Sequence, residues 1–419
     1  MKRQTRDEVV VCIDAWPHMP ARRAGWLRRS GWGDRADITF EYDQTWLAAH
    51  DAFSLDPSLI LGSGEQRHGR GRLHGIFSDA APDRWGRKLL ERREVVLASR
   101  EGRRARALDE WDFLTGVNDA TRMGALRLRS PSDGRFIDDH PLAVPPRADL
   151  RDLAAAADRI ERGAKASEGD VAGWLEKLIA PGASLGGARP KATFENSDGA
   201  QWIAKFPAPS DRRDIGAWEY VLARLAARAG IDVPPHDILR LASDHHTFVA
   251  RRFDREGSHR RLFASAMTLL DQDDHADGVS YLDIAAAIEL HGTPSATAIA
   301  SDLEELFRRV VFNAVTGHRD DHLRNHGFLH DGHGWRLAPA FDQNPMPEKE
   351  AHELAFDHVS TTPDLALISS TARLYRLDDA RAAGIIAKVK AAATTWRDVA
   401  KELGIASDEQ EIVASAFMV

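Results

Sequence analysis

The most informative segment of this sequence is His318-Arg319-Asp320-Asp321-His322-Leu323-Arg324-Asn325. It fits letter for letter the pattern H-R-D-x-x-x-x-N, which is typical of a catalytic loop for phosphoryl transfer. Asp320 would accept or orient the proton of an attacking hydroxyl, and Asn325 would hold Mg²⁺ through its amide oxygen. Gly317 and Gly327 on either side favour a loop over a continuous helix.

The same stretch has a competing interpretation as a metal site. His318, His322 and His326 recur at helical spacing, and two histidines four residues apart on a helix can bind zinc. The general-base glutamate of the H-E-x-x-H motif is missing, however, because Arg319 takes its place. The acidic stretch 271–278 is similar to a calcium loop but lacks the closing glutamate, which favours a solvated turn.

A second carboxylate follows the predicted catalytic loop at a short distance along the chain. A hairpin is expected from Gly327 to Phe341, with its turn at Asp331-Gly332-His333-Gly334. It ends at Phe341-Asp342, where Asp342 would complete the metal site. Because Gln343 follows, the D-F-G triplet of protein kinases is absent.

Cationic and glycine-rich segments precede the loop in the chain. The run from Gly182 to Lys191, GASLGGARPK, leads into a predicted strand, and its glycines would let backbone N–H groups approach phosphate. It is not a Walker loop, and on its own it reads as an ordinary turn. Lys205 shares a strand face with Ile203, so it either extends its ammonium group to solvent or holds a phosphate. Glu219 on the next helix is its natural ion-pair partner, or else part of a solvated helix face.

Composition excludes several classes of protein. Of the 419 residues, 43% are hydrophobic and 29% are charged, as in a compact folded protein. The net charge of -8 gives no overall attraction to nucleic acid or acidic membranes. No apolar run could span a membrane, the start Met1–Glu8 is charged, and Cys12 is the single cysteine, expected in a strand. We therefore expect a cytoplasmic protein without disulfides or membrane contact.

The order of predicted elements divides the chain into four parts. Strands are expected at Val9–Ile13, Ile38–Tyr42, Lys191–Glu195, Gln201–Phe206 and His246–Arg252, and helices at Trp85–Leu97, Leu150–Ala180 and Asp214–Gly230. The arginines of Arg84–Arg106 alternate with acids and indicate a charged helix face. We expect an N-terminal α/β subdomain (1–129), a linker (130–149), a sheet-rich small lobe (150–267) and a helical lobe (268–419). This is an α+β, two-lobed, protein-kinase-like fold.

These motifs, in this order, resemble the HipA family of serine/threonine kinases over nearly the whole chain. Further stretches carry the resemblance: Phe40-Glu41-Tyr42, Phe77 to Gly86, Asp112-Phe113-Leu114, Arg122 to Leu126, Gly187 to Lys191, Ile203 to Pro207, Arg252 to Arg255, Asp320 to Asn325 and Leu337 to Asp342. Each is weak alone, but together they are specific. Two features depart from the family pattern, namely Arg251 and the His318-Arg319 pair before Asp320.

The resemblance implies an ATP- and Mg²⁺-dependent site between the lobes. Asp320 would be the catalytic residue, and Asn325 and Asp342 would bind the metal. The nucleotide would contact Ser184, Leu185, Gly186, Gly187, Ala188, Lys191, Lys205, Glu219, Arg251, Phe253, His322, Asn325 and Asp342. Ser184 matches the serine that the family phosphorylates on itself, and a dianion there would repel ATP.

The resemblance also implies partners, and two rival functions stay open. Family members phosphorylate an aminoacyl-tRNA synthetase, usually glutamate–tRNA ligase, and are neutralised by a HipB-like helix-turn-helix antitoxin that binds operator DNA. Contact with DNA would then be indirect, through the antitoxin. One rival is a kinase acting on a small molecule or lipid. The other is a non-catalytic protein that acts only within the antitoxin and DNA complex.

Overall fold

The computed structural model describes residues 7–15, 21–139, 144–163, 187–273 and 278–419, together with Gly173 and Leu178. Two compact units are present. Unit 1 comprises Met1–Pro209 and Asp254–Ala264, and unit 2 comprises Ser210–Phe253 and Ser265–Val419. The predicted small lobe, 150–267, contributes residues to both units, and the predicted domain boundaries stay predictions.

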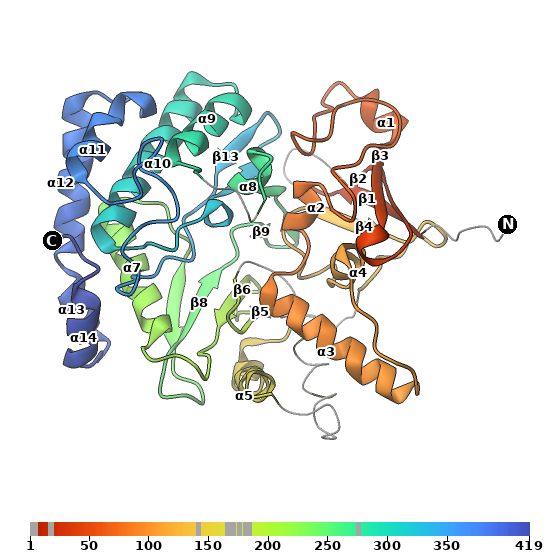
Figure 1. Cartoon of the computed structure of the whole chain (residues 1–419), viewed down its shortest axis with the longest axis horizontal. Helices are drawn as coiled ribbons and strands as arrows, with labels where there is room; N and C mark the ends of the chain where they lie inside the picture. The colour runs from red at the N-terminus through yellow and green to blue at the C-terminus, as the bar shows by residue number, and fades with distance from the viewer. Residues whose placement is uncertain are drawn as a thin grey trace. The chain divides into compact units, whose positions relative to one another are not determined.

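Unit 1 contains a four-stranded antiparallel sheet in the order β3-β2-β1-β4 (Figure 1). Its strands are β1 (Asp7–Ile13), β2 (Arg22–Ser30), β3 (Asp37–Tyr42) and β4 (Leu126–Arg129). Val9, Val11 and Ile13 of β1 are buried, so alternate residues of this strand face the core. Cys12 lies in β1 as expected, half-buried, and burial raises the pKa of its thiol. Burial therefore disfavours the reactive thiolate.

Along the chain, most helices of unit 1 lie between β3 and β4 of this sheet, and the last lies between β4 and the hairpin that starts at Lys191. They are α1 (Gln44–Leu47), α2 (Gly75–Asp79), α3 (Arg84–Arg100), α4 (Glu110–Thr115) and α5 (Leu150–Glu161). Asp83 caps α3 by accepting from the backbone N–H of Gly86 at 2.8 Å. The charged face predicted for α3 and the residues after it is confirmed by ion pairs: Arg87 with Glu110, Arg103 with Glu94, and Arg106 with Asp112.

The predicted first hairpin of the small lobe is also present in unit 1. It consists of β5 (Lys191–Glu195) and β6 (Gln201–Lys205), joined through a turn in which Gly199 has φ +74°. The Trp85 indole N–H donates to the carbonyl of Lys191 at 3.1 Å, which fastens α3 to β5. Two further short strands, β9 (Arg255–Glu256) and β10 (His259–Arg260), pair with each other.

Unit 2 is mostly helical, as the sequence predicted for the C-terminal part of the chain. Its helices are α7 (Ile215–Ala229), α8 (Ala266–Leu269), α9 (Tyr281–His291), α10 (Ala296–Thr316), α11 (Leu365–Ser370), α12 (Asp379–Ala393), α13 (Trp396–Glu402) and α14 (Ser407–Ala414). α12 packs against both α7 and α10, and α13 packs against α7 (Figure 1). α7 begins after its cap Asp214 and ends at Gly230, whose φ of +86° stops the helix.

Unit 2 contains two antiparallel strand pairs, and the second is part of a three-stranded sheet in the order β11-β12-β13. β7 (His236–Leu239) pairs with β8 (Thr247–Arg251), and β12 (Gly327–His330) pairs with β13 (Trp335–Leu337). The second pair is the hairpin predicted after the catalytic loop. β11 (Phe263–Ser265) lies across the chain junction between the units. In the described parts of the chain, none of the helices has the length and apolar character that crossing a membrane requires.

Candidate active site

The predicted catalytic loop begins where α10 ends. The C-cap of α10 is Gly317, with φ +63°, and the chain then leaves the helix direction. A Cβ at this position would lie 2.4 Å from the carbonyl oxygen of Ala416, so the approach of the C-terminal segment requires glycine. The loop itself contains a single short 3-10 turn, Leu323–Asn325.

This geometry removes the helical basis of the zinc interpretation. α10 ends at Thr316, so His318, His322 and His326 do not share a helix face. The Nε2 atom of His326 lies 2.8 Å from Asp321 Oδ2, and His318 Nδ1 lies 3.0 Å from the carbonyl oxygen of Asn344. His322 is exposed. Of the stretch similar to a calcium loop, residues 274–277 lie outside the described residues.

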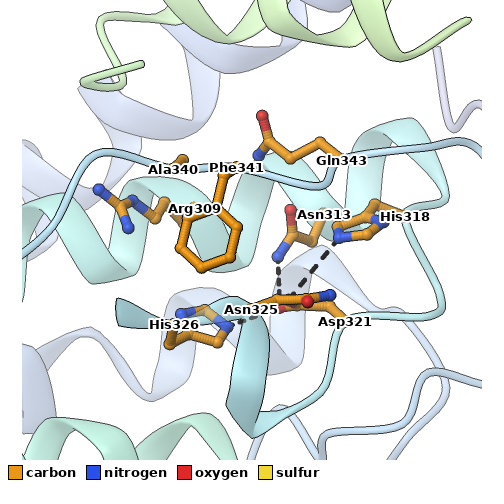
Figure 2. A pocket seen from close by; sticks show the side chains of 9 residues that line it. All are labelled: Arg309, Asn313, His318, Asp321, Asn325, His326, Ala340, Phe341 and Gln343. Atoms are coloured by element: carbon orange, nitrogen blue, oxygen red, sulfur yellow. Dashed lines mark hydrogen bonds and ion pairs between the residues drawn. The ribbon is translucent and has the colours of Figure 1, made fainter. Parts of the chain in front are cut away.

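A buried network around Asp321 anchors the loop (Figure 2). Its Oδ2 accepts hydrogen bonds from the hydroxyl of Tyr281 at 2.8 Å and from the amide of Asn313 at 2.7 Å. His326 contributes the third close contact, and the nearest nitrogen of His318 lies 3.7 Å from Oδ1. Asp321 is only 2% exposed, so a carboxylate with this many donors fixes the loop on α9 and α10.

The electrostatics of this network follow from burial and from the carboxylate. Burial acts to raise the pKa of Asp321, but the imidazoles of His326 and His318 hold it well below its usual range. Burial and the Asp321 carboxylate raise the pKa of Tyr281, so the phenol keeps the proton that it donates. For His318, burial opposes the charge, but the hydrogen bond and charge of Asp321 raise its pKa. No local pattern predicts this role, since Tyr281 is 40 positions away from Asp321.

Asp320, the predicted catalytic residue, has the opposite environment from its neighbour. Its side chain is 51% exposed, and its Oδ1 accepts a close hydrogen bond from the ammonium group of Lys349. Lys349 also donates to Glu353 at 2.6 Å. The sequence around Lys349, Glu348-Lys349-Glu350, is typical of an ordinary charged surface, so it does not predict this contact. Of the two adjacent aspartates, only Asp320 is accessible to a substrate hydroxyl.

Asn325 and Asp342 are the predicted metal ligands. The Asn325 amide N–H donates to the backbone carbonyl of Asp320 at 3.2 Å, which leaves the amide oxygen as the group able to bind a cation. Asp342 has φ +60°, a left-handed conformation that is uncommon for a residue other than glycine and frequent at functional sites. It lies between Phe341 and Gln343, which line a small pocket together with Asn325 (Figure 2).

The donor set of these two residues suits Mg²⁺. One amide oxygen and one carboxylate are hard ligands, and Mg²⁺ in phosphoryl-transfer sites takes its remaining ligands from phosphate and water. Across the described residues, no group of three or more His, Cys, Asp or Glu side chains is placed to hold a metal.

Lys205, the predicted phosphate-binding lysine, lies opposite Lys191, a predicted nucleotide contact, on the β5–β6 hairpin of unit 1. Lys191 and Lys205 are cross-strand partners, so their side chains leave the sheet on the same face. Lys191 is 1% exposed, and its Nζ donates to Asp83 Oδ2 at 2.6 Å and to the carbonyl of Gly187 at 3.2 Å. The Asp83 carboxylate thus offsets the positive charge of Lys191, which lies opposite Lys205 on the hairpin. Lys191 fastens the glycine-rich loop to α3, and its contact with a nucleotide stays a prediction.

The other predicted nucleotide-binding residues are distributed over both units. Gly187 and Ala188 are exposed, whereas Ser184, Leu185 and Gly186 lie outside the described residues. Glu219 lies on α7 in unit 2 and is 4% exposed, so the interpretation as a solvated helix face is wrong. Its predicted ion pair with Lys205 joins residues of different units and stays a prediction.

Arg251 and Phe253, two predicted nucleotide contacts, belong to a segment of unit 2 that contacts the turn carrying Asp342. Arg251 ends β8 and is half-buried, and its backbone N–H donates to the carbonyl of Pro235 at 2.8 Å. The ring of Phe253 packs on the ring of Phe341, with centroids 5.4 Å apart. Phe253 therefore lies beside the metal-site turn, although 88 positions separate the two rings in sequence.

An antiparallel hairpin bearing two lysines, a helical unit and an Asp-Asn-Asp site define a protein of the two-lobed, kinase-like α+β class. The chain belongs to the HipA family. The model of the HipA N-terminal domain matches residues 18–129, and the model of the HipA-like C-terminal domain matches residues 183–396. The fold predicted from the sequence is confirmed.

Relatives and a solved structure agree with this assignment. HipA of Shewanella oneidensis, solved with HipB and its operator DNA, shares the fold with a TM-score of 0.65 at 16% identity, covering 97% of this chain and 94% of that one. A Haemophilus influenzae protein named "Putative kinase" is 28% identical over 191 residues, or 40% of this chain. A Sinorhizobium fredii protein, "Putative kinase Y4mE", is 30% identical over 150 residues, or 33% of this chain. The matches span 54% and 33% of these two relatives.

Proposed function

We propose that this chain is an ATP-dependent protein kinase that transfers the γ-phosphate to a serine or threonine hydroxyl. The observation that carries the proposal is that one short loop holds both the accessible carboxylate of Asp320 and the buried amide of Asn325. Asp342 follows in strained backbone beside the same pocket. Positioning and neutralisation of charge are the main requirements of phosphoryl transfer, and these residue types supply both.

The chemistry assigns one role to each group. The Asp320 carboxylate takes the proton of the hydroxyl as its oxygen forms a bond to the γ-phosphorus, the bond to the bridging oxygen breaks, and ADP leaves. Asn325 and Asp342 would hold Mg²⁺, which neutralises charge on the phosphate oxygens. Lys205 would bind the phosphates and pair with Glu219, while Arg251 and Phe253 would contact the adenine.

We further propose that the chain acts as the toxin of a HipA/HipB-like pair and inactivates itself by phosphorylating Ser184. Family membership supports the first part, and the Shewanella protein that shares the fold was solved with HipB and operator DNA. A HipB-like antitoxin is then the expected partner, with a protein such as an aminoacyl-tRNA synthetase as substrate. Phosphate on Ser184 would add negative charge to a loop that surrounds phosphate and would repel ATP.

The decisive experiment is mass spectrometry of the full chain after incubation with Mg²⁺ and ATP. We expect phosphate on Ser184 in the wild type and transfer lowered by several orders of magnitude in Asp320→Asn, with the thermal unfolding temperature unchanged. Near-normal transfer by Asp320→Asn would overturn the assignment of the base. If neither protein is labelled, an ATP titration separates a kinase that needs a small molecule, lipid or other substrate from a non-catalytic binding protein, which would not bind ATP.

A further inference from the structure

Lys349 belongs to the segment that follows Asp342, and that segment is fastened to the catalytic turn. The backbone N–H of Met346 donates to the carbonyl of Gly317 at 2.9 Å, and that of Glu353 donates to the carbonyl of Arg319 at 3.2 Å. The Arg319 guanidinium returns a bond of 2.8 Å to the carbonyl of Met346. Lys349 therefore reaches Asp320 from a backbone that is held to the same turn on both sides of it.

The Lys349 ammonium group lies between the carboxylates of Asp320 and Glu353 and donates a hydrogen bond to each. It donates closely to Asp320 Oδ1 and, four residues further along the chain, to Glu353 Oε1 at 2.6 Å. Burial acts against its charge, but the bonds to Asp320 and Glu353 raise the pKa of Lys349, so the amine is protonated at neutral pH. Among the described residues, Lys349 is the side chain that the structure pairs with the Asp320 carboxylate.

Apart from Lys349, little fixes the orientation of the half-exposed Asp320 carboxylate. The backbone of Asp320 is held by Asn325, but its carboxylate could rotate among several rotamers without a partner. Proton transfer requires that the base lie within hydrogen-bond reach of the attacking hydroxyl, and a displacement of about 1 Å can cost on the order of 100-fold in rate.

We infer that Lys349 is a positioning residue that orients the Asp320 carboxylate for proton transfer, with Glu353 holding the ammonium group from the other side. This inference rests on the proposed kinase function. It also gives the segment after Asp342 a specific task, because any movement of residues 346–353 away from the turn would release the base.

The test compares variants of the full chain by single-turnover transfer from γ-labelled ATP and by ATP binding. We expect Lys349→Met to lower the transfer rate about 10- to 100-fold while the dissociation constant of ATP stays within about twofold. Lys349→Arg, which keeps a donor and the charge, should recover most of the rate. Glu353→Gln should cost only a fewfold. Lys401→Met, an exposed lysine on α13, is the control and should match the wild type.

Several results would contradict the proposed role of Lys349. A Lys349→Met protein that transfers phosphate at or above the wild-type rate would overturn it, as would a loss that tracks weaker ATP binding. Failure of Lys349→Arg to recover any rate, with unfolding temperature unchanged, would also exclude a role in orienting the carboxylate. A wild type that neither binds ATP nor transfers phosphate would instead overturn the proposed function, and this inference with it.

Discussion

Asp320 and Asp321 show how two identical neighbours acquire different roles from their surroundings. Asp320 reaches solvent and Lys349, whereas Asp321 enters the core and accepts bonds from Tyr281, Asn313 and His326. Substitutions at the two positions should therefore separate chemistry from stability.

Asp321→Ala should destabilise the protein strongly. It leaves a buried phenol, amide and imidazole without their shared acceptor, for which we expect a loss of about 3–5 kcal/mol in the free energy of unfolding. Asp320→Ala, at a half-exposed position, should cost less than about 1 kcal/mol. Urea unfolding at pH 7 checks both values, and equal losses in the two variants would contradict the division of roles.

His352 predicts a pH dependence of stability. The ring is 4% exposed, and across the described residues neither ring nitrogen has a hydrogen-bond partner. Burial, aided by the charge of His318, lowers its pKa to about 3. Between this value and the ordinary value of about 6.5, the unfolded chain binds a proton that the folded chain does not, so stability falls as the pH falls.

His352→Phe should remove this dependence, because the substituted ring cannot titrate. Between pH 7 and pH 5 the wild type should lose roughly 2 kcal/mol more unfolding free energy than the variant. The new ring has an aromatic neighbour in Phe356, whose centroid lies 4.8 Å from that of His352. Parallel slopes of stability against pH in the two proteins would contradict the lowered pKa, because they would mean that His352 takes up its proton over the same pH range in the folded and unfolded chains.

At the scale of elements, the end of α10 determines where the catalytic turn begins. Gly317 combines a left-handed backbone with a contact that leaves no room for a Cβ, since Ala416 lies against it. The turn, the C-terminal segment and the helix end thus meet at one residue, and a side chain there must displace one of them.

Gly317→Ala should destabilise the protein by about 2–4 kcal/mol, of which roughly 1 kcal/mol comes from the left-handed backbone and the rest from the clash. Gly404→Ala is the matched control, because Gly404 has φ +72° after α13 and no atom within 4 Å of the added Cβ. It should cost about 1 kcal/mol. Thermal unfolding distinguishes the two, and similar losses would mean that the C-terminal segment moves aside without cost.

Elements with strong local signals could be predicted from the sequence, and those defined by distant partners could not. α3, α7 and the hairpins β5–β6 and β12–β13 carry caps, glycine turns or alternation within their own residues. β2 was missed because its sequence, RRAGWLRRS, is rich in arginine, and the ion pairs that make this acceptable come from elsewhere: Arg28 with Glu8 and Glu41, and Arg29 with Asp7 and Asp109.

The same division applies to the candidate site. Asp320, Asn325 and Asp342 stand close together in sequence in a recognisable pattern. The residues that support them, such as Tyr281, Asn313 and Lys349, come from a helix start, a helix interior and an irregular segment. Their identities are common at such positions, so only the three-dimensional packing reveals them.

At the scale of the molecule, the last residues of the chain complete unit 2. Glu409 of α14 accepts from the Trp218 indole N–H at 2.7 Å and from the backbone N–H of Asp214 at 2.9 Å, 195 positions away. Trp396 stacks on Phe417 with centroids 4.7 Å apart. The start of α7 is therefore held by the C-terminal end of the chain.

Glu409→Ala should cost about 1–3 kcal/mol in unfolding free energy, because the Trp218 side chain is buried and its N–H loses an acceptor. Glu411→Ala, on the same helix, removes only an exposed pair with Arg397 and should cost less than about 0.5 kcal/mol. Chemical denaturation of both variants checks the difference. Equal stability would show that α14 is not needed to hold the start of α7.

Unit 1 also includes an eleven-residue segment from the second half of the chain, Asp254–Ala264. Within it, Asp254 Oδ2 accepts from the backbone N–H of Gly124 at 2.8 Å, and Arg260 pairs with Asp119 at 2.9 Å. A gene fragment that stops at codon 209 would omit these buried contacts and encode an incomplete fold. Recombination between relatives can therefore exchange unit 1 as a working cassette only if two separate stretches of DNA move together.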